Sequence, residues 1–92
     1  MRVRFFFFVS QATGQDEVAV PAESAPDIST LVRVLVGRFG ERLARQLLTS
    51  DGAIRRDVNI LVNGRNVQFL SGADTRLSDE DTVSFLSAVA GG

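Results

Sequence analysis

The sequence predicts an α+β domain in which one mixed sheet is covered on one face by a central helix. Two observations carry this prediction. Short stretches with the two-residue alternation of strands lie on both sides of one longer stretch with helical spacing. In addition, 92 residues are enough for one modest core but not for two. We therefore expect a single domain over residues 1–92, with the element order β-β-α-β-β-β and a flexible tail at about residues 87–92.

The first expected strand covers residues 2–9, where side chains alternate between two faces. Its buried face is expected to consist of Val3, Phe5, Phe7 and Val9. Two arginines mark the opposite face as the outer one, so Phe6 and Phe8 on that face need a cover or a partner. A turn signal at residues 13–16 and apolar alternation at residues 17–21 then predict a hairpin.

The central helix is expected to begin after Asp27, whose carboxylate suits an N-cap. Its apolar residues recur with helical spacing at Ile28, Leu31, Val32, Leu35 and Phe39. Gly40 interrupts this pattern, a second helical segment follows at residues 41–48, and residues 50–52 end it. A stripe of arginines shares one helical face at Arg38, Arg42 and Arg45. Such a stripe is either an anion site or, more commonly, a solvated surface.

The C-terminal half predicts a second hairpin and a last strand. A strand at residues 58–62 leads into Asn63-Gly64, a strong hairpin signal because both residues tolerate positive φ. The returning strand includes residues 67–69, and the last strand covers residues 82–88, with Leu86 on its outer face. The expected core between helix and sheet consists of Val3, Phe5, Phe7, Leu31, Leu35, Val58, Ile60, Val62, Phe69, Val83 and Phe85.

Composition excludes several classes of function. The chain lacks Cys, His, Trp, Tyr and Lys, so it has no thiol nucleophile, imidazole base or Schiff-base amine. We therefore expect neither an enzyme nor a metal or cofactor site. The net charge of −1 gives no basic surface for nucleic acid. No apolar stretch approaches the roughly 20 residues that span a bilayer, and no signal-peptide pattern is visible, so we expect a cytoplasmic protein that binds no membrane.

The sequence ends in Gly91-Gly92. Two glycines at a chain end present a main-chain carboxylate without side chains around it, and such a carboxylate can enter a narrow active site of another protein. A frayed terminus is the simpler interpretation of the two glycines alone. The rest of the sequence has to decide between these interpretations.

Two longer stretches, together with the element order, carry a resemblance that covers essentially the whole chain. Residues 55–64 read RRDVNILVNG and residues 77–92 read LSDEDTVSFLSAVAGG. They resemble the β-grasp sulfur carriers of the MoaD/ThiS family, relatives of ubiquitin. Two features depart from the family pattern. Glu80 stands where a glycine is usual, and Ser87-Ala88 stands where prolines are common, which implies a less stiff tail.

This resemblance implies how the chain acts. An ATP-dependent adenylating enzyme of the ubiquitin-activating type would activate the carboxylate of Gly92. Sulfur from a persulfide would then convert it to a thiocarboxylate for use by a sulfur-accepting synthase. The tail that enters these partners consists of Val89, Ala90 and Gly91. The first and last strands are neighbours in such folds, so Phe6 and Leu86, extended by Phe8, are expected to form a partner-binding patch.

Three alternatives remain open at this point. The segment at residues 40–57 favours the longer branch of the family, with molybdopterin-synthase small subunits and CysO-like carriers for cysteine synthesis, and the ending looks closer to the CysO-like group. A second alternative is a ubiquitin-like modifier conjugated to proteins through Gly92. The third is a non-covalent interaction module that binds through Phe6 and Phe8.

Overall fold

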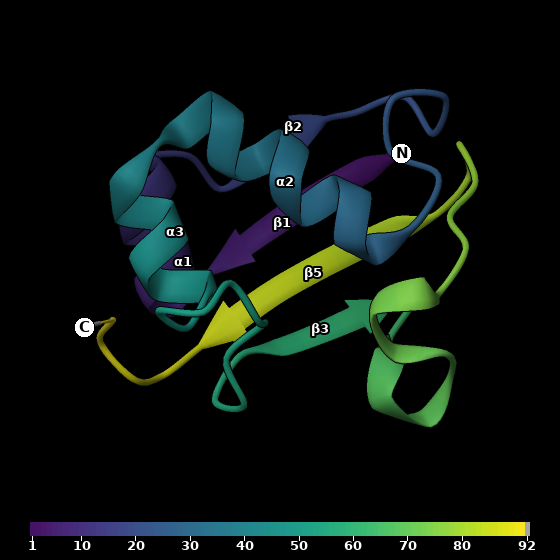
Figure 1. The fold of residues 1–92 in the computed structure, drawn as a ribbon. Coiled ribbons are helices and arrows are strands. Elements are labelled where there is room, and N and C mark those ends of the chain that lie inside the picture. Colours follow the sequence, from purple (N-terminus) through teal and green to yellow (C-terminus); the bar gives the residue numbers. More distant parts are fainter. Residues whose placement is uncertain (92) are drawn as a thin grey trace.

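One mixed sheet with two helices across one of its faces forms the body of the protein (Figure 1). The computed structural model describes residues 1–91. The elements are β1 (Arg2–Phe6), α1 (Phe7–Thr13), β2 (Glu17–Ala19), α2 (Ile28–Phe39), α3 (Glu41–Leu47), β3 (Asn59–Val62), β4 (Arg65–Asn66), two short 3-10 helices, η1 (Val67–Phe69) and η2 (Gly72–Asp74), and β5 (Thr82–Ser87). The strand order is β2-β1-β5-β3-β4.

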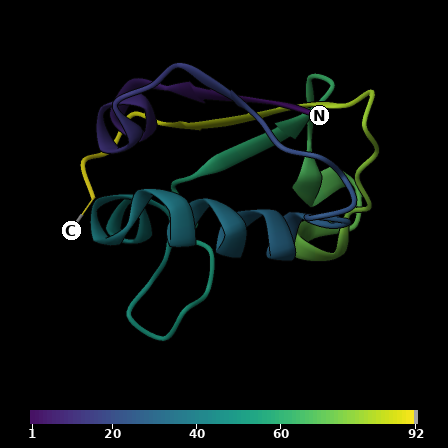
Figure 2. The same ribbon diagram turned by 90° about the horizontal axis from the view of Figure 1, so that it is seen from above.

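The sheet is mixed because β1 and its neighbour β5 run parallel, whereas the other neighbouring pairs are antiparallel. Figure 2 shows α2 and α3 on one side of this sheet. The predicted architecture of a mixed sheet covered on one face by a central helix is therefore confirmed.

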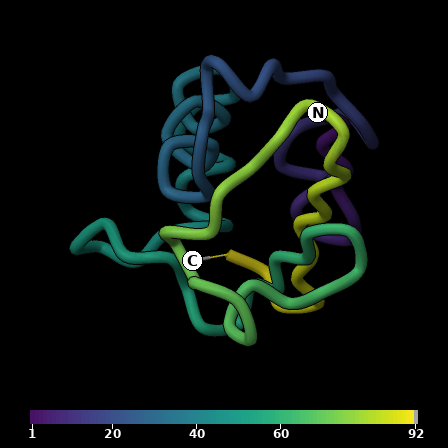
Figure 3. The backbone as a smooth tube through the Cα atoms, turned by 90° about the vertical axis from the view of Figure 1, so that its right-hand side faces the viewer, coloured from purple at the N-terminus to yellow at the C-terminus, as the bar shows by residue number. Residues whose placement is uncertain are grey.

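The predicted start and break of the helical region are also confirmed. The Asp27 carboxylate accepts a hydrogen bond of 2.8 Å from the Thr30 N–H, which satisfies one of the free donors at the start of α2. At Gly40 the backbone takes a φ of 83°, where a side chain would be strained, and α3 begins at the next residue. The loop between α3 and β3 then stands away from the sheet (Figure 3).

Most of the predicted core is correct. The core packs between the inner face of the sheet and the helices, and nine of the expected residues are buried there: Val3, Phe5, Leu31, Leu35, Val58, Ile60, Val62, Val83 and Phe85. Phe7 and Phe69 are corrections, because their side chains are 62% and 76% exposed.

The predicted strand at residues 2–9 is wrong beyond Phe6. The chain turns into α1 at Phe7, whose φ is 53°, an unusual value for a bulky residue. Helical geometry lets Val9 reach the core while Phe7 points outward. Four consecutive phenylalanines contain no alternation between apolar and polar residues, so the pattern could not show where the strand ends.

The second predicted hairpin is correct at its turn but not in its returning strand. Asn63 and Gly64 take φ values of 52° and 84°, as a tight hairpin turn requires. The returning strand β4 is only two residues long. The Asn66 side chain then accepts a hydrogen bond of 3.0 Å from the Gln68 N–H and starts η1, which turns Phe69 away from the core.

Candidate functional site

Three parts of the chain meet at one end of the sheet. Because β1 and β5 are parallel, their carboxyl ends lie at the same edge, and both arrowheads point to the side where α1 and α3 lie and where the chain leaves β5 (Figure 1). Ser87, the last residue of β5, is 1% exposed, and the tail leaves the sheet directly after it.

The outer face of the sheet carries an apolar cluster beside this end. Phe6 of β1 is paired in register with Leu86 of β5, as the family resemblance implied. Leu61 of β3 lies on the same face, opposite Ser84 of β5. All three apolar side chains are half-buried. We call Phe6, Leu61 and Leu86 the outer patch.

Sequence reasoning missed Leu61, although a signal was available. Residues 60–62 read Ile-Leu-Val, so the strand is apolar on both of its faces, which is unusual when one face meets only water. An apolar residue on the outer face of such a strand indicates a second contact surface.

Charged and polar residues border the outer patch. The Arg4 guanidinium lies 5.1 Å from the centre of the Phe6 ring, within the range of a cation–π contact. Glu17 pairs with Arg2 at 3.2 Å and with Arg4 at 3.9 Å. On the opposite side, Asn66 donates a hydrogen bond of 3.3 Å to Asn59. An apolar centre with a polar rim is typical of protein-binding surfaces.

The predicted position of Phe8 is wrong in one respect. It does not extend β1 on the outer face, because the strand ends before it. Instead, Phe8 lies on α1 and lines a groove of about 210 Å³ together with residues of α3 and of the tail. Its role in partner binding stays a prediction.

The tail lies in this same groove, where Ala90 and Gly91 form part of the lining. The Gln46 carboxamide of α3 donates a hydrogen bond of 2.7 Å to the Val89 carbonyl and accepts one of 2.8 Å from the Gly91 N–H. The Ser87 hydroxyl donates to the same Val89 carbonyl at 3.1 Å. Gly92, the predicted reactive residue, lies outside the described residues.

Gln46 was also missed, although the sequence held a sign of it. It sits three residues after Leu43 and directly before Leu47, on the apolar face of α3, and is 4% exposed. A polar residue at a buried helical position usually has a specific hydrogen-bonding partner.

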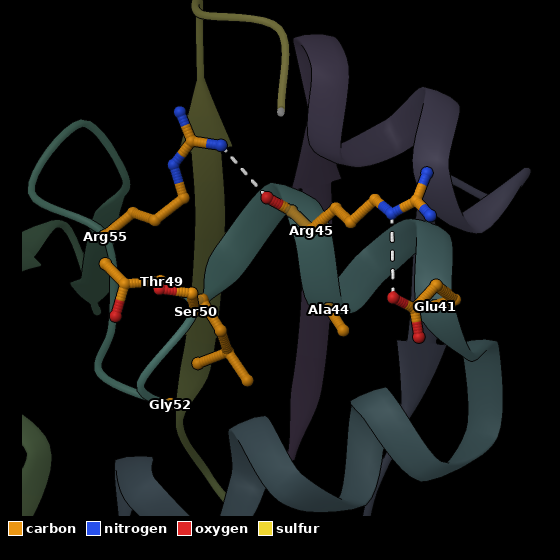
Figure 4. A pocket seen from close by; sticks show the side chains of 8 residues that line it. Glu41, Ala44, Arg45, Thr49, Ser50, Gly52 and Arg55 are labelled. Atoms are coloured by element: carbon orange, nitrogen blue, oxygen red, sulfur yellow. Dashed lines mark hydrogen bonds and ion pairs between the residues drawn. The ribbon is translucent and has the colours of Figure 1, made fainter.

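A larger cavity of about 590 Å³ lies between α3 and the loop that follows it (Figure 4). Arg45 and Arg55 border it, and the Arg55 guanidinium donates to the Arg45 carbonyl at 2.9 Å. Arg45 pairs with Glu41 at 3.6 Å, and Arg55 pairs with Asp57 at 2.6 Å. Both guanidiniums already have a carboxylate partner, so the cavity does not direct a free positive charge toward a ligand.

Within residues 1–91, no group of three or more acidic residues has the arrangement of a metal site. None of the helices described there combines the length and apolar character needed to cross a bilayer.

The chain is similar in sequence to known proteins over most of its length. The model of the ThiS family matches residues 3–92. Small archaeal modifier protein 3 of Haloferax volcanii is 34% identical over 92 residues, which cover 100% of this chain and 98% of that protein. The sulfur carrier protein CysO of Mycobacterium bovis is 34% identical over 79 residues, or 86% of this chain and 83% of that protein.

A solved structure extends the comparison to the fold. In the crystal structure of the Amycolatopsis orientalis BexX/CysO complex, one chain superposes with a TM-score of 0.77 at 26% identity, covering 99% of this chain and 98% of that one. The β-grasp fold predicted from the sequence is therefore confirmed.

Proposed function

The chain belongs to the ThiS family, and we propose that it is a sulfur carrier that acts through the carboxylate of Gly92. The family match over residues 3–92 carries this proposal, because it includes the tail as well as the folded body. The outer patch supports it, since a carrier without catalytic side chains has to be recognised by the enzymes that act on it.

The carrier chemistry consists of two steps in partner enzymes. The Gly92 carboxylate is an anion at neutral pH and a poor acyl donor. It attacks the α-phosphorus of ATP in an adenylating partner, and pyrophosphate leaves. A persulfide sulfur then attacks the acyl carbon, the bond to AMP breaks, and a thiol of the partner cleaves the sulfur–sulfur bond to release the thiocarboxylate. A sulfur-accepting synthase uses this group.

The pathway that we propose is cysteine synthesis, because the CysO proteins are among the relatives and the ending of the chain looks like theirs. A molybdopterin-type acceptor is the alternative within the same chemistry. Chain that already carries the thiocarboxylate, mixed in turn with an acceptor enzyme of each type, distinguishes the two by which enzyme consumes this group.

A second function, conjugation to other proteins through Gly92, is favoured by one observation. One relative that matches the chain from end to end is a small archaeal modifier protein. Both functions begin with the same adenylate, so the tail alone does not separate them. Conjugation would give a covalent adduct with a target protein, whereas a carrier would leave a free thiocarboxylate.

Adenylation tests the proposal directly. Purified chain, incubated with ATP, a cognate adenylating enzyme, a persulfide sulfur donor and a thiol, should release AMP and gain the mass expected when sulfur replaces one oxygen. Deleting Gly92, or adding one residue after it, should abolish both signals. The melting temperature should not change, because a terminal tail contributes little to the core. If a chain without Gly91 and Gly92 still accepted sulfur, the proposed function would be wrong.

A further inference from the structure

One buried side chain holds the tail as a neighbouring strand would. Gln46 is bonded to the carbonyl of Val89 and to the N–H of Gly91, the groups on either side of Ala90. The backbone of a parallel strand makes this same pair of bonds with its neighbour. Because Gln46 is 4% exposed, its carboxamide is almost removed from water, and the tail satisfies both of its polar ends.

The groove also requires the glycine at position 91. A Cβ on this residue would lie 2.9 Å from the Arg45 carbonyl oxygen and 2.9 Å from the Cα of Gln46. Both atoms belong to the backbone of α3, which cannot move aside as a flexible side chain could. The docked tail therefore needs a glycine at position 91, because only a residue without a side chain can lie this close to α3. This requirement is separate from any that the active site of a partner imposes.

We propose that Gln46 is an intramolecular clasp that keeps the tail on the α1–α3 face, and that the adenylating partner has to open this clasp before Gly92 can react. The inference rests on the proposed function only in naming the tail as the reacting segment. A protein whose binding-competent state is a fraction of the population binds more weakly by that fraction. The clasp therefore raises the KM of the partner for this chain and leaves kcat unchanged.

The strength of the clasp is set by two hydrogen bonds at a partly buried site. Bonds of this kind shift an equilibrium between docked and released tails by roughly tenfold. A clasp of this strength protects the chain end most of the time and still opens when a partner binds the outer patch and the tail together. Gln46 is thus a positioning residue, since it acts through the tail.

The first experiment measures the tail alone and needs no partner. In the native chain, the heteronuclear NOE of the Gly91 amide should approach that of β5, and this amide should exchange slowly with solvent. Gln46→Leu removes both bonds at similar side-chain volume, so the Gly91 amide should become as mobile as in an unstructured peptide. Gln68→Leu, the same change on an exposed side chain, is the control and should change neither value.

If Gln46→Leu does not fold, Gly91→Ala is a second variant that should release the tail, and it leaves the core of the domain intact. If the Gly91 amide of the native chain is already as mobile as a free peptide, the clasp does not exist in solution. This result is independent of sulfur transfer, so it stands even if no adenylating partner accepts the chain.

The second experiment measures adenylation kinetics with the full-length chain. Gln46→Leu should lower the KM for the carrier threefold to tenfold with kcat unchanged, and Gln68→Leu should leave both constants as they are. An unchanged KM in a variant whose tail has been released would overturn the gating role. Failure of the native chain to be adenylated at all would instead count against the proposed function.

Discussion

The same strands form both faces of the sheet, but the side chains on the two faces differ in burial. On the inner face, Phe5 and Phe85 are at most 2% exposed and pack under the helices. One residue further along the same two strands, Phe6 and Leu86 are half-buried on the face that the helices do not cover. The difference shows that a domain of this size can bury its large apolar side chains on one face and still carry partly exposed apolar residues on the other.

The largest expected effect tests the inner face. Phe85→Ala should lower the free energy of unfolding by about 3–5 kcal/mol, because it removes a fully buried ring from a packed core. Leu86→Ala, one residue away on the outer face, is the matched variant and should cost about 1 kcal/mol or less. Urea unfolding of both variants measures the difference. Equal losses would show that the outer face is also part of the core.

The next largest effect concerns binding through the outer patch. Changing Phe6 and Leu86 together to Ser should weaken binding of the adenylating partner by tens-fold or more, since apolar anchors typically contribute about 2 kcal/mol each. The melting temperature should change little. Calorimetric titration with the partner and a thermal melt give the two values. A variant that unfolds while its folded fraction still binds normally would place the docking surface elsewhere.

A smaller effect on stability is expected at Phe7, and its size tests whether β1 ends before this residue. Phe7→Ala should change the free energy of unfolding by no more than about 1 kcal/mol, because the ring is mostly exposed. Phe5→Ala is the matched change two residues earlier and should cost about 3–5 kcal/mol. Thermal unfolding of the pair compares them. Similar losses of unfolding free energy in both variants would instead support the strand predicted at residues 2–9, with Phe7 on the inner face.

The smallest expected effect on stability comes from Asp81, which directly precedes β5. Burial raises the pKa of Asp81, but hydrogen bonds from the Ser78 N–H at 2.8 Å and the Asn63 amide at 2.9 Å outweigh it and hold the pKa below its usual value. The stabilisation is therefore present above the unfolded-state pKa of 3.8 and is lost as pH falls through the lower folded-state value.

Asp81→Asn provides the measurement. Its melting temperature should lie a few degrees below that of the native chain at neutral pH, and this gap should close under acidic conditions. Thermal melts of both chains across the acidic range show whether the difference in melting temperature shrinks as the pH falls. A gap that stayed constant with pH would show that the charge of Asp81 contributes nothing.

Local patterns in the sequence were enough for much of the fold. The cap at Asp27, the break at Gly40 and the turn at Asn63-Gly64 each depend on backbone geometry within a few residues, and each was predicted correctly. The register between Phe6 and Leu86 followed from the family resemblance rather than from any local pattern.

By itself, then, the sequence determined the family, the layered architecture, most of the core and the glycine-ended tail. Only the tertiary structure decided that β1 stops at Phe6, that Phe69 is turned outward and that Gln46 holds the tail. Gln46 and Gly91 are 45 residues apart in the chain. Periodicity reports which residues share a face of one element, but it contains no information on which distant backbone groups a buried carboxamide will meet when the elements pack.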